Sequence, residues 1–140
     1  MKRQKQLNGS AAEVEAAFYD ALNRADLNAL MALWADDEEI VCIHSGGARL
    51  IGHAAIRASW QTILEHGGLH ILPTQLHETH NLMSSVHTVV EGVSAASGEA
   101  AHLMATNVYV KTPRGWRIVL HHVSLAPGSA QPDMKAQILH

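Results

Sequence analysis

The chain has 140 residues, enough for one domain that buries roughly two thirds of its unfolded surface. Hydrophobic residues make up 47% of the sequence and charged residues 16%, which is typical of a globular protein and excludes a disordered one. The net charge of −3 argues against nucleic-acid binding, which needs a basic face.

Membrane insertion and secretion are not expected. No apolar run approaches the ~20 residues of a membrane helix, and the first ten residues lack the apolar stretch of a secretory signal. The single cysteine, Cys42, excludes an intrachain disulfide and fits a reducing compartment. We therefore expect a cytoplasmic protein without a membrane or nucleic-acid partner.

Three helices are predicted in the first half of the chain. Ser10 followed by Glu13 is a capping box, and an apolar stripe of helical period follows it. Asp26 is the expected N-cap of a second, shorter helix. A third helix begins after Gly52 and ends at Gly67, because glycine favours helix ends.

Six strands are predicted around the third helix and after it. Two short strands, 40–43 and 49–51, form a hairpin before that helix. Four long strands then follow, separated by short turns typical of an antiparallel meander: 70–82, 86–96, 99–111 and 116–125. Three helices and then an antiparallel run predict an α+β fold, with the helices on one face of a curved sheet.

The strands carry apolar residues on both faces, as in Val108-Tyr109-Val110. A sheet covered by helices on one side should show polar alternation on the other. We therefore expect the second, convex face to be buried in a homodimer. The predicted organisation is a flexible N-terminus over 1–10, one domain over 11–126 and a C-terminal extension over 127–140.

Three stretches resemble a known superfamily. They are Leu33–Asp37 after the Asp26 turn; Cys42-Ile43-His44 with Gly52 to Trp60; and Thr106–Tyr109 with Trp116 to Ser124. Residues 11 to 125 resemble the nuclear-transport-factor-2-like superfamily, in particular its bacterial SnoaL-like branch. Relatives include ketosteroid isomerases and the association domain of calcium/calmodulin-dependent protein kinase II. The resemblance implies a cone-shaped barrel with a ligand pocket between helices and sheet.

The resemblance also implies that the ketosteroid isomerase catalytic set is missing. That enzyme uses an aspartate base and an oxyanion hole of a tyrosine and a protonated aspartate. The base position falls on Ile43, which cannot take a proton. The tyrosine falls on Phe18, with Tyr19 one residue away, and the second aspartate falls near Met104. We therefore expect no isomerisation by that mechanism and a more apolar pocket, in which Trp34 and Trp60 replace two further tyrosines.

By the same resemblance, Leu120, His122 and Ser124 face the pocket, whereas His121 and Val123 face away. The predicted lining is Phe18, Trp34, Ile43, His44, Trp60, Met104, Leu120, His122 and Ser124. The candidate acid–base groups are His122, His44 and Glu91. Each has a structural alternative. His122 could be a hydrogen-bonded core histidine and His44 a turn histidine, and Glu91 could lie on the outer face or pair with Arg117.

Eleven histidines raise the question of a metal, but their spacing gives no support. No HxH, HExxH or Cys/His spacing occurs, and Gly67-Gly68 interrupts the His66/His70 pair. We expect no metal and no cofactor.

Three functions stay open. The chain could bind a small, largely apolar molecule without chemistry, act as a cyclase or isomerase through a pocket histidine or glutamate, or serve as an oligomerisation module. Polar groups converging on an open pocket favour the enzyme. A pocket filled by Trp34, Trp60 and Met104 favours assembly.

Overall fold

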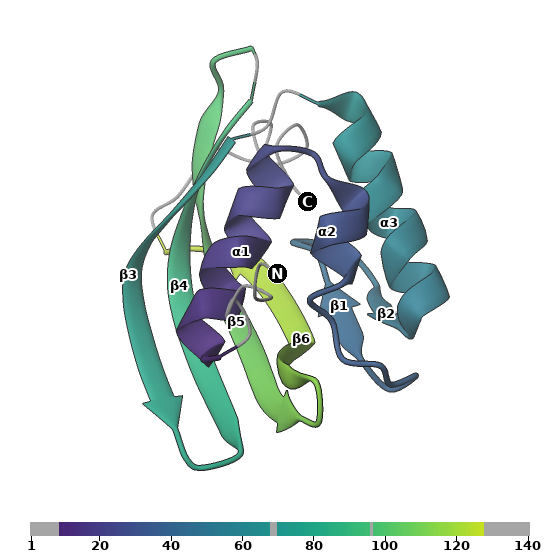
Figure 1. The fold of residues 1–140 in the computed structure, drawn as a ribbon. Helices are drawn as coiled ribbons and strands as arrows, with labels where there is room; N and C mark the ends of the chain where they lie inside the picture. Colours follow the sequence, from purple (N-terminus) through teal and green to yellow (C-terminus); the bar gives the residue numbers. More distant parts are fainter. Residues whose placement is uncertain (1–8, 68–69, 96, 128–140) are drawn as a thin grey trace, which may run out of the picture.

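The computed structural model describes residues 9–67, 70–95 and 97–127 (Figure 1). Most of the predicted N-terminal segment and nearly all of the predicted C-terminal extension lie outside these residues. The elements follow the predicted order: α1 Ala11–Asn23, α2 Leu27–Met31, β1 Val41–Ile43, β2 Arg49–Ile51, α3 His53–His66, β3 His70–His80, β4 Ser84–Ser94, β5 Ala100–Thr112 and β6 Gly115–Leu125.

The helices begin at the residues that the sequence predicts. Ser10 Oγ accepts a hydrogen bond from the backbone N–H of Glu13 at 3.1 Å, which confirms the N-cap of α1. Asp26 Oδ1 accepts one from the N–H of Ala29 at 3.0 Å and begins α2. Gly52 precedes α3 with a φ of 92°, a conformation that favours glycine.

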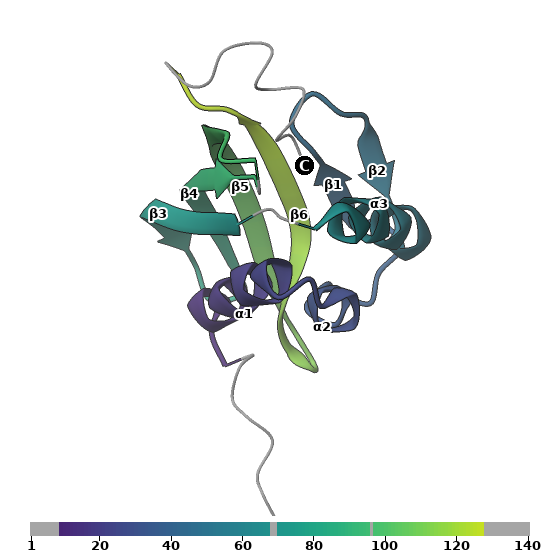
Figure 2. The same ribbon diagram turned by 90° about the horizontal axis from the view of Figure 1, so that it is seen from above.

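One mixed sheet of six strands runs in the order β2-β1-β6-β5-β4-β3. The pairing of β1 with β6 is parallel and the other pairings are antiparallel. The three helices lie on one side of this curved sheet (Figures 1 and 2), which confirms the α+β prediction. The sheet does not close into a complete barrel, because β2 and β3 are its two free edges.

The edge strand β3 is irregular. Its pairing with β4 shifts register between Thr74 and His77, and Gln75 between them has a φ of 53°. Pro73, two residues earlier, has no backbone N–H to donate. Almost the whole strand is exposed, with Ile71 as its one buried residue.

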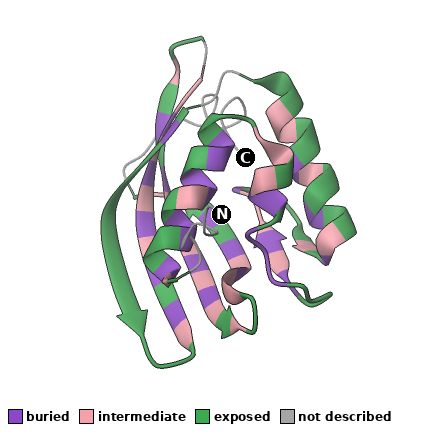
Figure 3. Ribbon diagram, viewed as in Figure 1, coloured by how far each residue is buried: buried purple, intermediate pink, exposed green. Residues whose placement is uncertain are grey.

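The inner face of the sheet forms the core with the helices. Buried and partly exposed positions alternate along β4 and β5 (Figure 3), as expected for strands with one covered face. Phe18 of α1 and Trp60 of α3 lie in this core and are almost fully buried. None of the helices in the described part of the chain has the length and hydropathy of a membrane-spanning helix.

A bulge interrupts the alternation on β6. Tyr109 of β5 pairs with Ile118, but the preceding residue, Val108, pairs with Leu120. Val119 is therefore the extra residue of a β-bulge. Ile118 faces the core before the bulge, and His121 and Val123 face the core after it.

Candidate functional site

The structure reverses the predicted orientation of the two adjacent histidines. His121 is fully buried, and its ring centroid lies 5.0 Å from that of Phe18 and 5.8 Å from that of Trp60. His122 is exposed on the opposite face of β6. The predicted face assignment is wrong because a strand exchanges its faces when one residue is inserted, and the bulge at Val119 is such an insertion.

The same correction applies to four other predicted pocket residues. Leu120 pairs with Val108 on the outer face, and Ser124 pairs with Met104 there. Ile43 of β1 lies beside His122, whereas its neighbour Cys42 lies beside His121 in the core. Of the predicted lining, Ile43, Met104, Leu120, His122 and Ser124 thus lie on the outer face of the sheet.

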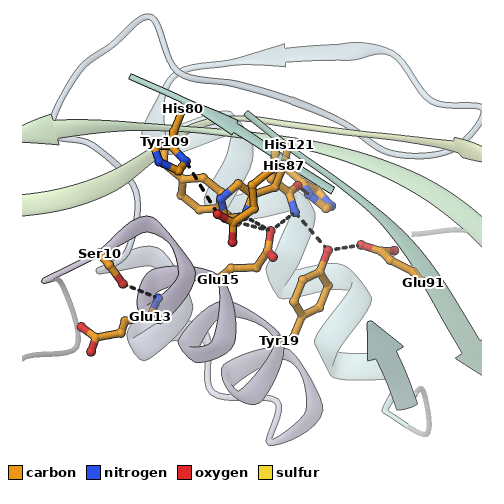
Figure 4. Close-up of polar contacts among 11 residues, drawn as sticks. Ser10, Glu13, Glu15, Tyr19, His80, His87, Glu91, Tyr109 and His121 are labelled. Carbon is orange, nitrogen blue, oxygen red and sulfur yellow. Dashed lines mark hydrogen bonds and ion pairs between the residues drawn. The ribbon is translucent and has the colours of Figure 1, made fainter. Parts of the chain in front are cut away.

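The core face carries a buried polar network centred on Glu15 of α1 (Figure 4). Its Oε2 atom accepts hydrogen bonds from Tyr109 Oη at 2.7 Å and from Asn107 Nδ2 at 3.1 Å. His87 Nδ1 lies 3.1 Å from the same oxygen, within ion-pair distance. Burial favours a raised pKa for Glu15, but the three polar neighbours outweigh it and the pKa is lowered. The Glu15 carboxylate is therefore held in its charged form.

Tyr19, one helical turn after Glu15, extends the network to Glu91 of β4. Tyr19 Oη donates to Glu91 Oε2 at 2.7 Å, and Asn107 Nδ2 donates to Tyr19 Oη at 3.1 Å. Burial and the nearby Glu91 carboxylate raise the pKa of Tyr19 well above its ordinary value. The phenol therefore stays protonated and acts as a donor. Both alternatives for Glu91, an outer-face position and a pair with Arg117, are wrong.

Asn107 connects this network to His121. Asn107 Oδ1 lies 2.6 Å from His121 Nδ1. Because the amide nitrogen of Asn107 faces the acceptor-only Glu15 carboxylate, its oxygen must be the atom that faces His121. That oxygen can only accept, so His121 Nδ1 donates. A neutral His121 then carries its lone pair on Nε2.

His44 and Cys42 complete the inner surface at β1. His44 Nε2 lies 2.6 Å from Ser59 Oγ of α3, and its ring meets the Trp60 ring edge-on at 4.7 Å. His44 therefore contacts the aromatic cluster of Phe18, Trp60 and His121 from the side of β1. Burial, with a contribution from the Glu91 carboxylate, raises the pKa of the Cys42 thiol to about 12. Cys42 is thus unreactive.

Most of this network is absent from the sequence-based prediction, which expected a more apolar inner face. Glu15 and Tyr19 are four residues apart and so share one helix face, while His87 and Glu91 share one strand face. Asn107 and Tyr109 likewise share a face of β5. These spacings were available in the sequence. That each polar group meets a partner across the core depends on the packing of α1 on the sheet.

Two cavities lie outside the aromatic cluster. One of about 720 Å³ lies between the loop after α2 and the β5–β6 turn, and Trp34 and Arg114 contribute to its wall. The other, of about 280 Å³, lies between the N-terminus of α1 and the β3–β4 hairpin. Trp34 therefore lines a cavity other than the predicted one. No group of three potential metal ligands occurs among the residues that the structure describes.

The sequence profile of the SnoaL-like domain matches residues 12–128, which is most of the chain. The chain belongs to the SnoaL-like domain family. No curated protein matches this SnoaL-like chain significantly. The family explains the architecture, since similar solved structures are described as NTF2-like or cystatin-like.

Two solved structures are similar in sequence as well as fold. A candidate calcium/calmodulin-dependent protein kinase type II association domain from Thiobacillus denitrificans is 33% identical, with a TM-score of 0.75; the match covers 84% of this chain and 96% of that one. A candidate dehydratase of the NTF2-like family from Streptomyces avermitilis is 27% identical, with a TM-score of 0.76 and coverages of 82% and 92%. A candidate ketosteroid isomerase from Parabacteroides distasonis, 19% identical with a TM-score of 0.71 and coverages of 90% and 96%, shares the fold.

Proposed function

We propose that this SnoaL-like domain binds a small, largely apolar or aromatic molecule between α1, α3 and the sheet, and moves a proton to or from it. The observation that carries the proposal is the 2.6 Å contact between Asn107 Oδ1 and His121 Nδ1, which fixes Nε2 as the basic nitrogen. A histidine whose tautomer is fixed presents one defined proton acceptor, which suits general acid–base catalysis.

The surroundings of His121 support an apolar or aromatic ligand. Phe18 and Trp60 pack against its ring, and aromatic side chains recognise flat apolar molecules by area and by edge-to-face contact. The Tyr19 hydroxyl and the Glu91 carboxylate lie in the same core, so polar groups accompany the apolar wall. This combination is typical of ligand sites, where a few placed polar groups orient an apolar molecule.

The named relatives are consistent with proton transfer. One is a candidate dehydratase and another a candidate isomerase, and both reaction types move a proton at carbon or oxygen. Ile43 cannot supply the base, and its position on the outer face removes it from the site altogether. Proton transfer in this chain would therefore use His121, a residue outside the ketosteroid isomerase set.

The cellular location is a separate part of the proposal. The relatives named above come from bacteria, and the free Cys42 fits a cytoplasmic location, which we include in the proposal.

The test uses 2-indanone, a small aromatic ketone whose α-protons exchange with solvent. We expect the wild-type protein to accelerate deuterium exchange at these carbons in D₂O, followed by proton NMR. His121→Gln should lower the acceleration by about 10²–10⁴-fold, the usual contribution of a general base. The matched control is His122→Gln, on the outer face of the same strand, which should change the rate by less than about twofold.

Two results would contradict proton transfer at His121. One is equal exchange in both variants. The other is wild-type protein that binds 2-indanone in a thermal-shift assay without accelerating exchange, which would favour a binding module.

A second candidate function, assembly, is favoured by the outer face of the sheet. Val86 pairs with Val108 across β4 and β5, and Val90 pairs with Met104. Val86 is 38% exposed, although β3 and β5 pair with it on both sides. The 33% identity to a candidate association domain agrees with an assembling surface. We propose that this face pairs with a second copy of the chain, alongside the ligand site.

Light scattering at micromolar concentration should give the mass of a homodimer. Val108→Glu places a charge in the middle of the outer face and should halve that mass, because an unpaired charge buried in an interface is strongly unfavourable. Gln61→Glu, on the exposed surface of α3, should leave the dimer intact. A wild-type monomer at this concentration would remove the argument for pairing through the sheet.

A further inference from the structure

The 280 Å³ cavity at the N-terminus of α1 is separate from the aromatic cluster around His121. Its wall consists of the first turn of α1, the end of the β3–β4 hairpin with Glu78 and His80, the inner side of β4 at His87, and Trp116. A cavity of about 150 Å³ is enough to hold benzene. This one therefore has room for a single aromatic ring with a substituent.

His87 is a buried polar group at the wall of this cavity, next to the Glu15 network. The residue is 1% exposed; within the described residues Nε2 has no hydrogen-bond partner, and Nδ1 makes an ion-pair contact but no hydrogen bond. A buried nitrogen without a partner costs about 1–3 kcal/mol, so a bound molecule that supplies a partner would be stabilised. The other nitrogen, Nδ1, faces Glu15 Oε2 at 3.1 Å.

The Glu15 carboxylate determines which kind of molecule fits. Three neighbours keep it charged, as described above, and a charged oxygen beside Nδ1 favours the proton on that nitrogen. In a neutral His87 the lone pair is then on Nε2, so Nε2 accepts a hydrogen bond.

We infer that this cavity binds a small phenol, whose hydroxyl donates to His87 Nε2. Trp116 supplies an aromatic wall for the ring. The O–H proton moves toward Nε2, and the resulting imidazolium is paired with Glu15. The negative charge that develops on the phenol oxygen lies near the first turn of α1, where the helix dipole favours an anion. A benzoate, which brings a full negative charge and no donor, fits less well, because the Glu78 carboxylate also lines the cavity.

The probe is 4-fluorophenol, followed by ¹⁹F NMR, with fluorobenzene as a matched probe that lacks the donor. The wild-type protein should bind 4-fluorophenol at least about tenfold more tightly than fluorobenzene or 4-fluorobenzoate. In ¹⁵N-labelled protein the Nε2 resonance of His87 should move toward the protonated position when 4-fluorophenol is added. His87→Leu keeps an apolar side chain of similar size but removes the acceptor, and should abolish the preference.

The ¹⁵N measurement is made on the wild-type protein, so it stands even where His87→Leu lowers stability. Equal affinity for the three probes would overturn the inference. A 4-fluorophenol titration that leaves His87 Nε2 unmoved while shifting resonances of Trp60 would place the probe in the aromatic cluster instead. Neither outcome depends on proton transfer at His121, which 2-indanone tests separately.

Discussion

Glu15→Leu should lower the free energy of unfolding by about 3–5 kcal/mol, the cost of removing one partner from a buried charged network. The leucine fills the space but accepts nothing, so Tyr109 Oη and Asn107 Nδ2 lose their shared acceptor. Urea unfolding measures the difference at fixed protein concentration. Glu65→Leu, on the exposed surface of α3, is the control and should change stability by about 0.5 kcal/mol or less. Equal losses in the two variants would show that the network contributes no net stability.

The Glu15 carboxyl also makes the free energy of unfolding depend on pH. The pKa of Glu15 is lower in the folded protein than its ordinary value of 4.5. Its contribution to stability is therefore complete above about pH 4.5 and is lost as the pH falls through the lower, folded value. The wild-type protein should lose stability on acidification below pH 4.5 more steeply than Glu15→Gln, which keeps the shape but does not titrate. Parallel curves in this range would contradict the lowered pKa.

Trp60→Ala should cost about 3–5 kcal/mol, because truncation of a fully buried tryptophan leaves a large cavity. Trp60 packs against the rings of Phe18, His44 and His121, so these three lose a common neighbour. Thermal and urea unfolding report the loss. Trp116→Ala is the control: Trp116 is partly exposed at the start of β6, and its truncation should cost less than half as much.

A loss of 1 kcal/mol or less at Trp60 would mean that the surrounding rings collapse into the space. That result would also show that the core between α1 and α3 can change shape, which would bear directly on how a ligand reaches His121.

The sequence predicted the fold well because local signals determine where the elements begin and end. The side chains of Ser10 and Asp26 make the predicted cap hydrogen bonds, and Gly52 has the positive φ of a helix start. The faces of β6 were predicted wrongly for an equally local reason. A single bulge at Val119 exchanges the faces of β6, and nothing in a run of apolar and β-branched residues indicates where such an insertion occurs.

The polar network shows a second limit of prediction from the sequence. Tyr19 is one residue from the position of the ketosteroid isomerase tyrosine, which is a rotation of about 100° round the helix. In the structure, its hydroxyl donates to Glu91 in the core. Glu15 and Asn107 meet across 92 positions of sequence, and only the packing of α1 on the sheet brings them together.

The irregular strand β3 has a consequence for the behaviour of the protein at high concentration. A free strand edge is a template on which further chains can add, and Leu72 and Leu76 make this edge apolar as well as exposed. Pro73 removes one backbone donor, and the left-handed Gln75 breaks the straight ladder that an incoming strand would need. The two interruptions therefore restrict the addition of further strands, and with it fibril-like growth, at β3.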